Sequence, residues 1–460
     1  MTAEYGWLSL LPPLTAVVLA LWMRHVFAAL AAAITVAALV LSHGSIAESA
    51  ERIAALFFDL LTTPWILKTL VFVVLVGSVM ELMRRSGGVE GFVHLLQERL
   101  ALVRSRRSAL LLVYVTGLVI FIESSITSLV AGAVGRPLAS RFRFSREKLA
   151  YVCDSTSAPV CSLLLLNGWG ALLLGLIAVQ VSAGHLEGDA VALLIGSVAY
   201  NFYAMIALVV TFVVIWFDWD IGAMKTAPIV AERIDTASGD GQAADMLVPL
   251  ALMVGGVFFF LWLTGEGNLL KGSGSSSVCC AMLLTLAATA VQYVVAGKMT
   301  FSAWWHGAAD GARALLPMAA ILLLAFAIGR MIGEVGTGAY LASFLDGATQ
   351  VAWLAAAVFA VAAVMAFSTG TSWGTFSVML PVAVTMGAAV DANAALLIGA
   401  VVSGGVFGDH CSPISDTTII ASLAAGCDHT SHVRTQLPYA LLAGGIALAM
   451  FALAGWRLSG

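Results

Sequence analysis

Four carboxylic acids stand among hydroxyl-bearing residues inside otherwise apolar stretches of the chain. They are Glu123, Asp154, Asp409 and Asp416. A carboxylate within the hydrocarbon zone of a membrane is costly and by default marks an ion or proton path. Burial raises the pKa of such an acid and a nearby cation lowers it. A site that holds either a proton or Na⁺, but not both, would therefore couple the two ions by competition.

Hydroxyl groups close to these acids could supply further oxygen ligands for an ion or a substrate. They belong to Ser124, Ser125, Thr127, Ser155, Thr156, Thr369, Thr371, Ser372, Ser412, Ser415 and Thr417. For Asp154 and Asp409 we favour binding of a transported ion over helix capping, whereas Glu123 and Asp416 fit either role. His410 could relay protons, because imidazole titrates near neutral pH, or it could only hold the backbone in place.

Two prolines beside the acids predict helices that break within the membrane. The motif "CDSTSAP" ends at Pro159, and "GDHCSPISDTT" contains Pro413. Proline lacks an N–H and clashes with the preceding helical turn, and neighbouring Ser, Thr and Asp offer the backbone other hydrogen bonds. We therefore predict broken helices over about 145–180 and 394–425. Their free carbonyls could coordinate Na⁺, and their half-helix N-termini could hold an anion.

Two further polar motifs, "FIESSITS" (121–128) and "FSTGTSWGT" (367–375), each separate two apolar runs. The run 109–122 would reach only about 21 Å as a helix, which is short of the ~30 Å hydrocarbon core. Polar backbone is tolerated at that depth only where protein or water satisfies it. We therefore predict re-entrant hairpins over about 109–141 and 351–389, each turning at its polar motif.

The composition indicates an all-α polytopic membrane protein. Of the 460 residues, 61% are hydrophobic and 10% are charged, whereas soluble domains hold about 25% charged residues. Apolar runs long enough to cross a bilayer predict full spans over roughly 7–23, 26–42, 65–83, 160–180, 189–217, 247–264, 278–297, 314–332 and 437–457. The N-terminus lacks a basic region, so we interpret it as a first span and not as a cleaved signal.

The chain divides into two halves around a polar linker at 218–246. In each half, 1–217 and 247–460, a span, a hairpin and a broken helix follow in the same order. Clusters of Arg and Lys between 84 and 107 and between 136 and 148 belong inside by the positive-inside rule. This puts the N-terminus outside and the linker in the cytoplasm, so the halves are predicted to be inverted repeats.

Three of these motifs resemble the NhaC-type Na⁺/H⁺ antiporters of the ion transporter superfamily. They are "SREKLAYVCDSTSAP" (145–159), "STGTSWGTFSVMLP" (368–381) and "FGDHCSPISDTTIIAS" (407–422). The resemblance implies a bacterial inner-membrane homodimer whose transport part moves as an elevator against a scaffold part. It also implies exchange of external protons for internal Na⁺, although some relatives move organic anions or amino acids.

The first hairpin departs from the pattern of that family, "F-x-D-D-Y-A-N". Its first acid is kept as Glu123, but the second position holds Ser124, and Ser125 and Thr127 replace the aromatic residue and the amide. Two hypotheses therefore stay open. The first is a Na⁺/H⁺ antiporter, and the second is a Na⁺- or H⁺-coupled transporter of a small organic solute, either a carboxylate or an amino acid.

Other classes of function find little support in the sequence. "GTSWG" (370–374) fits the nucleophile elbow of hydrolases, but that elbow follows a strand, and here the glycines suit a tight hairpin tip. We therefore expect no enzyme. Cys427, His429 and His432 have loosely metal-like spacing in a predicted cytoplasmic loop, where a structural or pH-sensing turn fits better. No basic patch suggests nucleic acid, so the expected partners are membrane lipid, Na⁺ and H⁺, without a cofactor.

Overall fold

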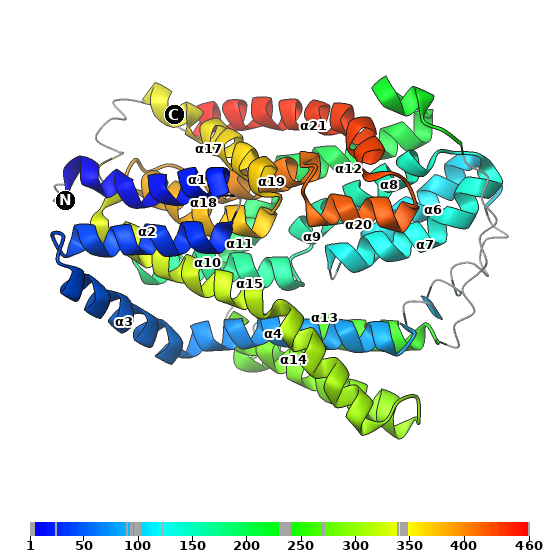
Figure 1. Cartoon of the computed structure of the whole chain (residues 1–460), viewed down its shortest axis with the longest axis horizontal. Helices are drawn as coiled ribbons and strands as arrows, with labels where there is room; N and C mark the ends of the chain where they lie inside the picture. The colour runs from blue at the N-terminus through cyan, green and yellow to red at the C-terminus, as the bar shows by residue number, and fades with distance from the viewer. Residues whose placement is uncertain are drawn as a thin grey trace.

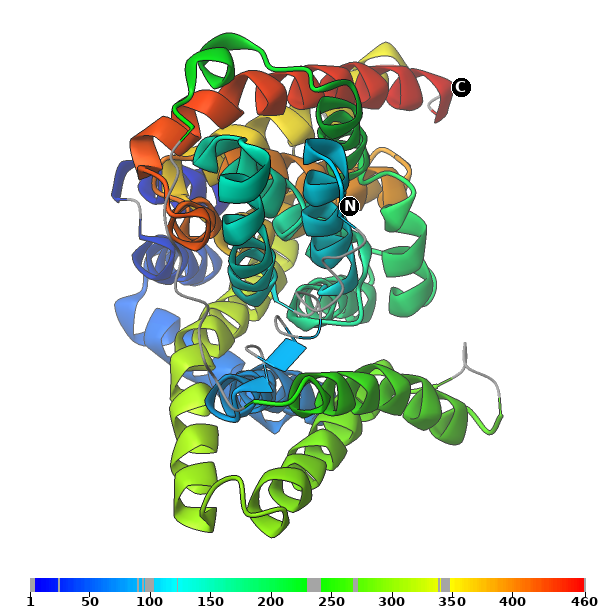
Figure 2. The same cartoon turned by 90° about the vertical axis from the view of Figure 1, so that its right-hand side faces the viewer.

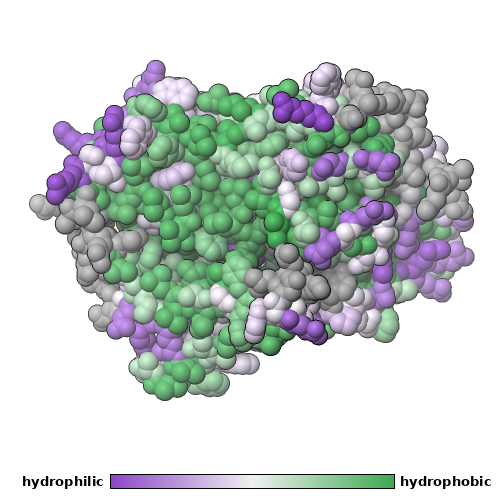
Figure 3. Space-filling model, turned by 180° about the vertical axis from the view of Figure 1, so that it is seen from behind, coloured by the Kyte–Doolittle hydropathy of each residue, from purple (hydrophilic) through white to green (hydrophobic). Residues whose placement is uncertain are grey.

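The computed structural model describes residues 5–23, 25–88, 91–92, 95, 103–121, 123–229, 241–267, 272–337, 340 and 348–458. Regular structure within these ranges is helical, and nine helical segments there are long and apolar enough to cross a bilayer. In Figure 3, apolar residues cover most of the middle of one face and hydrophilic residues gather toward its two ends. The predicted all-α polytopic membrane fold is confirmed.

The helices of the first half include two short ones at the start and a closely spaced group after residue 105. Their bounds are α1 (Leu11–Met23), α2 (Val26–Leu41), α3 (Ile46–Thr62), α4 (Pro64–Arg85), α6 (Arg106–Val119), α7 (Ser124–Phe142), α8 (Arg146–Ser155), α9 (Ala158–Leu163), α10 (Gly168–Ser182), α11 (Ala190–Val198) and α12 (Phe202–Phe217). A 3₁₀ turn, η1 (Gly6–Leu10), leads into α1. The amphipathic helix α3 had no counterpart among the predicted elements.

The second half repeats a helix pair and a broken helix in the same order as the first. Its bounds are η3 (Gly222–Thr226), α13 (Ala244–Thr264), α14 (Gly274–Ala290), the π turn η5 (Val291–Val295), α15 (Phe301–Val335), α17 (Ala348–Thr369), α18 (Ser372–Ala388), α19 (Ala394–Cys411), α20 (Asp416–Ala425) and α21 (His429–Leu458). The pairs α6–α7 and α17–α18 lie where hairpins are predicted. The pair α19–α20 lies where the second broken helix is predicted.

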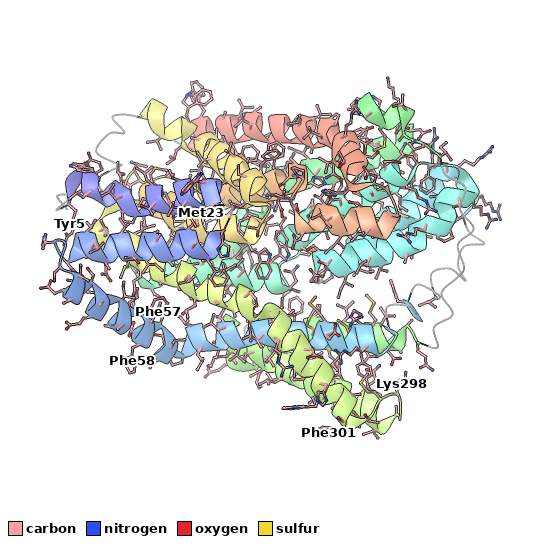
Figure 4. The ribbon with its side chains drawn as sticks, viewed as in Figure 1. Tyr5, Met23, Phe57, Phe58, Lys298 and Phe301 are labelled. Carbon is pink, nitrogen blue, oxygen red and sulfur yellow. The ribbon has the colours of Figure 1, made fainter. Side chains whose placement is uncertain are left out.

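Helices α4, α13, α14 and the first part of α15 form a layer beside the rest of the molecule (Figures 1 and 2). Helix α15 leaves this layer and runs into the main body. Where α15 crosses α4, a Cβ atom at Gly77 would lie 2.2 Å from the carbonyl oxygen of Gly311. Lys298, labelled in Figure 4, holds the turn before α15 to the start of α13, with Nζ 2.6 Å from Oδ2 of Asp245.

An ion cluster around a buried lysine connects the basic residues of the first half to the start of the polar linker. The side chain of Lys148 is fully buried, and its Nζ lies 2.6 Å from Oδ1 of Asp218 and 2.8 Å from Oδ1 of Asp220. A buried charge needs such partners, because an unpaired one would be very costly. Residues 230–240 of the predicted linker lie outside the described residues.

The span predicted over 189–217 is interrupted, because α11 ends at Val198 and α12 begins at Phe202. The two helices still belong to one apolar segment, Ala190–Thr226, that is long enough to cross a bilayer. Polar side chains form hydrogen bonds at this break, where the helical ladder of backbone hydrogen bonds is interrupted. Asn201 donates to Oγ of Ser162 at 2.9 Å, and Oγ of Ser403 accepts the backbone N–H of Tyr203 at 3.3 Å. Such side-chain hydrogen bonds compete with the helical ladder.

The first broken helix, predicted over 145–180 with one interruption, has two. The first separates α8 from α9 next to Pro159, as expected, and the second lies at 164–167, inside the predicted span 160–180. The whole segment Arg146–Ser182 is long and apolar enough to cross a bilayer. Asn167 caps α10 by accepting hydrogen bonds from the N–H groups of Trp169 and Gly170. Its amide also donates to the carbonyl of Phe121 at 2.8 Å, which ties this break to the first hairpin.

Local signals explain why each helix pair turns where it does. Glu123 caps α7 by accepting the N–H of Ile126 at 2.8 Å, and Thr371 caps α18 by accepting the N–H of Gly374. Gly370 precedes that cap with φ of +66°, and a Cβ there would lie 2.6 Å from the carbonyl oxygen of Ile414. Only glycine suits a left-handed backbone in such close contact. Ile122, in the first turn, lies outside the described residues.

Candidate functional site

A cavity of about 190 Å³ lies where the two helix pairs and the second broken helix meet α4 and α15. Its lining consists of Val73, Val76, Met80, Glu123, Ser124, Ser125, Gly168, Trp169, Leu315, Thr371, Ser372, Trp373, Asp409, Asp416 and Thr417. Residues from both halves of the chain therefore face one space. Eight of the residues predicted to bind ions or substrate belong to this lining.

The polar part of the lining is acidic. Glu123 comes from the turn before α7, and Asp409 and Asp416 come from either side of the break between α19 and α20. Asp409 is buried, Glu123 half-buried and Asp416 exposed. No Lys, Arg or His of the described chain lines the cavity. The lining therefore favours a cation over an anion, because like charges repel and opposite charges attract strongly at low dielectric.

One carboxylate oxygen of Asp409 accepts hydrogen bonds from the second helix pair, and the other has no hydrogen-bond partner among the described residues. Its Oδ2 accepts the hydroxyl of Ser372 at 2.6 Å and the backbone N–H of Ser372 at 3.3 Å. Among the described residues, Oδ1 has no hydrogen-bond partner, although Asp409 is only 2% exposed. A buried polar atom normally has a partner, so an unpaired Oδ1 is unusual.

The remaining wall of the cavity is apolar and aromatic. Val73, Val76 and Met80 of α4 and Leu315 of α15 form one side. The indole rings of Trp169 and Trp373 meet edge to face, with centroids 6.2 Å apart and an interplanar angle of 82°. A Cβ atom at Gly168 would lie 3.3 Å from the ring of Trp373, so the glycine gives this ring room. The cavity thus combines carboxylates with aromatic faces.

Asp154 occupies a sealed position and does not line this cavity. Its side chain is fully buried. Oδ2 accepts the amide of Gln436 at 2.7 Å and lies 3.3 Å from Nε2 of His432 and 3.9 Å from Nε2 of His410. Oδ1 has no hydrogen-bond partner among the described residues. Asp154 therefore belongs to an enclosed polar cluster.

His410 connects this enclosed cluster to the cavity, because it follows Asp409 on α19. Its Nδ1 lies 2.6 Å from the hydroxyl of Tyr203, and its Nε2 lies 3.3 Å from Oγ of Ser155. Its carbonyl accepts the amide of Gln436 at 2.6 Å. A chain of hydrogen-bonding groups thus runs from Asp154 to the backbone beside Asp409.

The sequence did not indicate Gln436, Tyr203 or Trp169 as site residues, and His432 was assigned to a loop. Instead, α21 begins at His429, and His432 and Gln436 lie one turn apart on its buried face. The polar pair at i and i+4 in an apolar helix was the available signal. His429 lies apart from His432, with Nε2 2.7 Å from the carbonyl oxygen of Pro413. Within the described residues, no three His, Cys, Asp or Glu side chains gather as metal ligands.

Comparison with known proteins identifies the family. A model described as the Na⁺/H⁺ antiporter family matches residues 160–456. The chain belongs to this family. It is 32% identical to an uncharacterized protein of Haemophilus influenzae over 98% of this chain and 91% of that protein. The resemblance to the NhaC-type antiporters is therefore confirmed.

Two local matches carry functional names. The chain is 34% identical to the Na⁺/H⁺ antiporter NhaC of Alkalihalophilus pseudofirmus, over 18% of each chain. It is 34% identical to a malate-2H⁺/Na⁺-lactate antiporter of Bacillus subtilis, over 22% of this chain and 21% of that one. Among solved structures, the YdaH transporter of Alcanivorax borkumensis superposes with a TM-score of 0.61 over 89% of both chains at 13% identity. That last likeness concerns the fold alone.

In this antiporter-family chain, the other predicted site residues hold the backbone of the breaks and turns. Several hydroxyls donate to carbonyl oxygens or pair with each other, among them Thr127, Thr156, Thr369, Ser412 and Ser415. Ser412, for example, donates to the carbonyl of Phe367 at 2.7 Å, and this joins the second break to the second helix pair. Pro413 lies in that break. Helix α17, and no strand, precedes Ser372, so the context of a nucleophile elbow is missing.

Proposed function

We propose that this protein is a secondary active antiporter that exchanges Na⁺ for protons by alternating access. The single observation that carries the proposal is the acidic cavity, where Glu123, Asp409 and Asp416 face one space without a base in the described lining. Carboxylates that share a confined site cannot all ionise without a counter-charge. A bound Na⁺ or a bound proton supplies that charge, and each favours loss of the other.

In this proposal Asp409 binds the cation and Asp154 carries a proton. The carboxylate of Asp409 and the hydroxyls of Ser372 and Thr417, which belong to the same lining, supply hard oxygen ligands. Asp154 lies away from the cavity, next to the imidazoles of His410 and His432. His410 links the two acids, so the charge on Asp154 affects the binding of a cation at Asp409.

Alternating access in this proposal is an elevator motion of the helix pairs and broken helices against α4 and α15. The cavity supports it, because its polar lining comes from α7, α18, α19 and α20 and its aliphatic wall from α4 and α15. Sliding along an aliphatic wall breaks no hydrogen bonds. The halves 1–217 and 247–460 would be inverted repeats with re-entrant hairpins. The protein would be a homodimer of the bacterial inner membrane, with its N-terminus outside.

The test is ion exchange in proteoliposomes with the Na⁺ and pH gradients varied independently. An outward Na⁺ gradient should drive protons inward in the absence of any other solute, and the reverse gradient should reverse the flux. Absence of Na⁺-dependent proton movement in protein that is folded and correctly inserted would refute the antiporter.

A second candidate is a Na⁺- or H⁺-coupled transporter of a small organic solute. It is favoured by the volume and the two indole rings of the cavity, and by the local match to a malate-2H⁺/Na⁺-lactate antiporter. Thermal unfolding of the purified protein with carboxylates and amino acids, each with and without Na⁺, separates the two candidates. Stabilisation by Na⁺ alone supports the antiporter, and stabilisation only by solute together with Na⁺ supports the alternative.

A further inference from the structure

We infer that the cavity binds a small organic cation, an ammonium ion that carries alkyl groups, in competition with Na⁺. The inference rests on the proposed function, since it concerns the substrate of the same cavity. Three features of the cavity carry it, namely its size, its charge and the arrangement of its aromatic rings.

The size of the cavity exceeds what an inorganic monovalent ion requires. A single ordered water needs roughly 10–15 Å³ of cavity space, whereas this cavity measures about 190 Å³. Its aliphatic wall, formed by Val73, Val76, Met80 and Leu315, offers no ligand to Na⁺ or to the water around it. A ligand with apolar groups would fill this part of the cavity and displace poorly held water, which favours binding.

The charge of the lining selects against a carboxylate or another anion. Three acids and, within the described chain, no base face the space, so an anion would meet like charge without a partner. Asp409 is itself buried, at 2% exposed, so its carboxylate needs a counter-charge, which a cation in the cavity would supply.

The two indole rings supply the surface that alkylammonium ions prefer. Trp169 and Trp373 stand at 82° to each other and both line the cavity. The negative face of an indole attracts a cation, and groups of aromatic rings hold methylated ammonium ions in other proteins. Na⁺ needs oxygen ligands instead, so the two rings distinguish an organic cation from Na⁺.

The experiment is isothermal titration calorimetry on the full-length chain in nanodiscs, at fixed pH and ionic strength. The probes are Na⁺, methylammonium, choline and the uncharged 3,3-dimethylbutan-1-ol, which has the shape of choline. We expect one of the ammonium ions to bind at least about 10-fold more tightly than Na⁺ and to be displaced by excess Na⁺, as cation–π contacts of ~2 kcal/mol would allow. The alcohol should not bind.

A variant of one ring separates the two kinds of cation. Trp373→Leu should weaken ammonium binding by about 2- to 30-fold, the range of cation–π contributions, and leave Na⁺ affinity unchanged. Trp373→Tyr keeps an aromatic face and should restore most of the affinity. Trp353→Leu is the matched control, because Trp353 belongs to the same helix pair, is 59% exposed and does not line the cavity.

The outcomes distinguish this inference from the proposed function. If Na⁺ binds and drives protons but no ammonium ion competes with it, the inference is wrong and the antiporter stands. The inference also fails if Trp373→Leu weakens Na⁺ and ammonium binding equally, or if the uncharged alcohol binds as tightly as choline. If Na⁺ moves no protons in proteoliposomes that hold folded, correctly inserted protein, the proposed function itself is wrong.

Discussion

The hydroxyl of Ser372 donates a 2.6 Å hydrogen bond to Oδ2 of Asp409, and this contact joins the first turn of α18 to the last turn of α19. The backbone N–H of Ser372 points to the same oxygen at 3.3 Å. One oxygen of the buried acid is therefore fixed by the tip of the second helix pair. Its other oxygen has no hydrogen-bond partner among the described residues, and movement of α18 would alter how Asp409 meets a cation.

We predict that Ser372→Ala lowers the affinity for the transported cation about 10-fold. A hydrogen bond to a charged group contributes about 1.5–3 kcal/mol, and about 1.4 kcal/mol corresponds to a factor of ten. Calorimetric titration with Na⁺ measures the change. Ser372→Thr keeps the hydroxyl and should stay close to the affinity of the unmodified protein. Equal affinities for all three proteins would show that this hydrogen bond does not orient Asp409 for binding.

Asp154→Asn and Asp409→Asn should both abolish Na⁺/H⁺ exchange, but for different reasons. Asn has nearly the shape of Asp and carries neither the charge nor the titratable proton, so folding should persist. Since only Asp409 lines the cavity, Asp409→Asn should lose cation binding as well. Asp154→Asn should keep most of the Na⁺ affinity while proton movement stops.

Fluorescence quenching of a pH dye in proteoliposomes measures exchange, and calorimetry measures binding. The matched control is Asp391→Asn, because Asp391 lies outside the cavity, in the turn after α18. Normal exchange by Asp154→Asn would remove Asp154 from the mechanism. Loss of Na⁺ binding in both variants would contradict the proposal that Asp409 binds the cation and Asp154 carries the proton.

The sequence predicted the cavity acids because they interrupt apolar runs next to Pro or Gly, or end a run that is too short. Asp409 and Asp416 flank Pro413, and Glu123 ends an apolar run too short to cross a bilayer. Such interruptions are costly in a membrane, so they are visible without a structure. The same reasoning found Asp154 but could not show that it is enclosed, because enclosure depends on His432 and Gln436 of α21, which lie far along the chain.

The residues around Asp154 and the break before α12 lack a local signal of this kind. His432, Gln436 and Tyr203 sit in regular helices, and only tertiary packing brings them to Asp154 and His410. The break before α12 contains neither Pro nor Gly. It depends on a hydrogen bond from Asn201 to Ser162, in an earlier helix. Local propensity cannot reveal interactions of that range.

Asn167 provides a test of how the first broken helix is held to the first hairpin. Its amide donates to the carbonyl of Phe121, and its Oδ1 caps α10. Asn167→Asp keeps the capping oxygen but loses the donor and buries a charge. We expect a loss of about 1–3 kcal/mol in the free energy of unfolding, measured as a lower melting temperature of the purified protein. Asn167→Ser, which can still cap α10 and adds no charge, should lose less stability. If the Asn167→Asp protein is as stable as the original, the hydrogen bond from Asn167 to Phe121 does not stabilise the protein.

The crossing of α4 and α15 offers a prediction about the wall of the cavity. Gly77 and Gly311 touch through their backbones, and a Cβ at Gly77 would lie 2.2 Å from the carbonyl oxygen of Gly311. Gly77→Ala should therefore force the helices apart and lower the free energy of unfolding by about 1–3 kcal/mol, as overpacking does. Gly255→Ala is the matched control, because a Cβ on this glycine of α13 meets nothing within 4 Å.

In an open helical position, replacing Gly by Ala stabilises a helix by up to about 1 kcal/mol, so the two variants should shift stability in opposite directions. Thermal unfolding in the same detergent compares them directly. Because α4 also supplies Val73, Val76 and Met80 to the cavity, Gly77→Ala should slow transport as well, whereas Gly255→Ala should not. If the Gly77→Ala protein is more stable than the original and transports normally, α4 and α15 can separate at this crossing without disturbing the cavity.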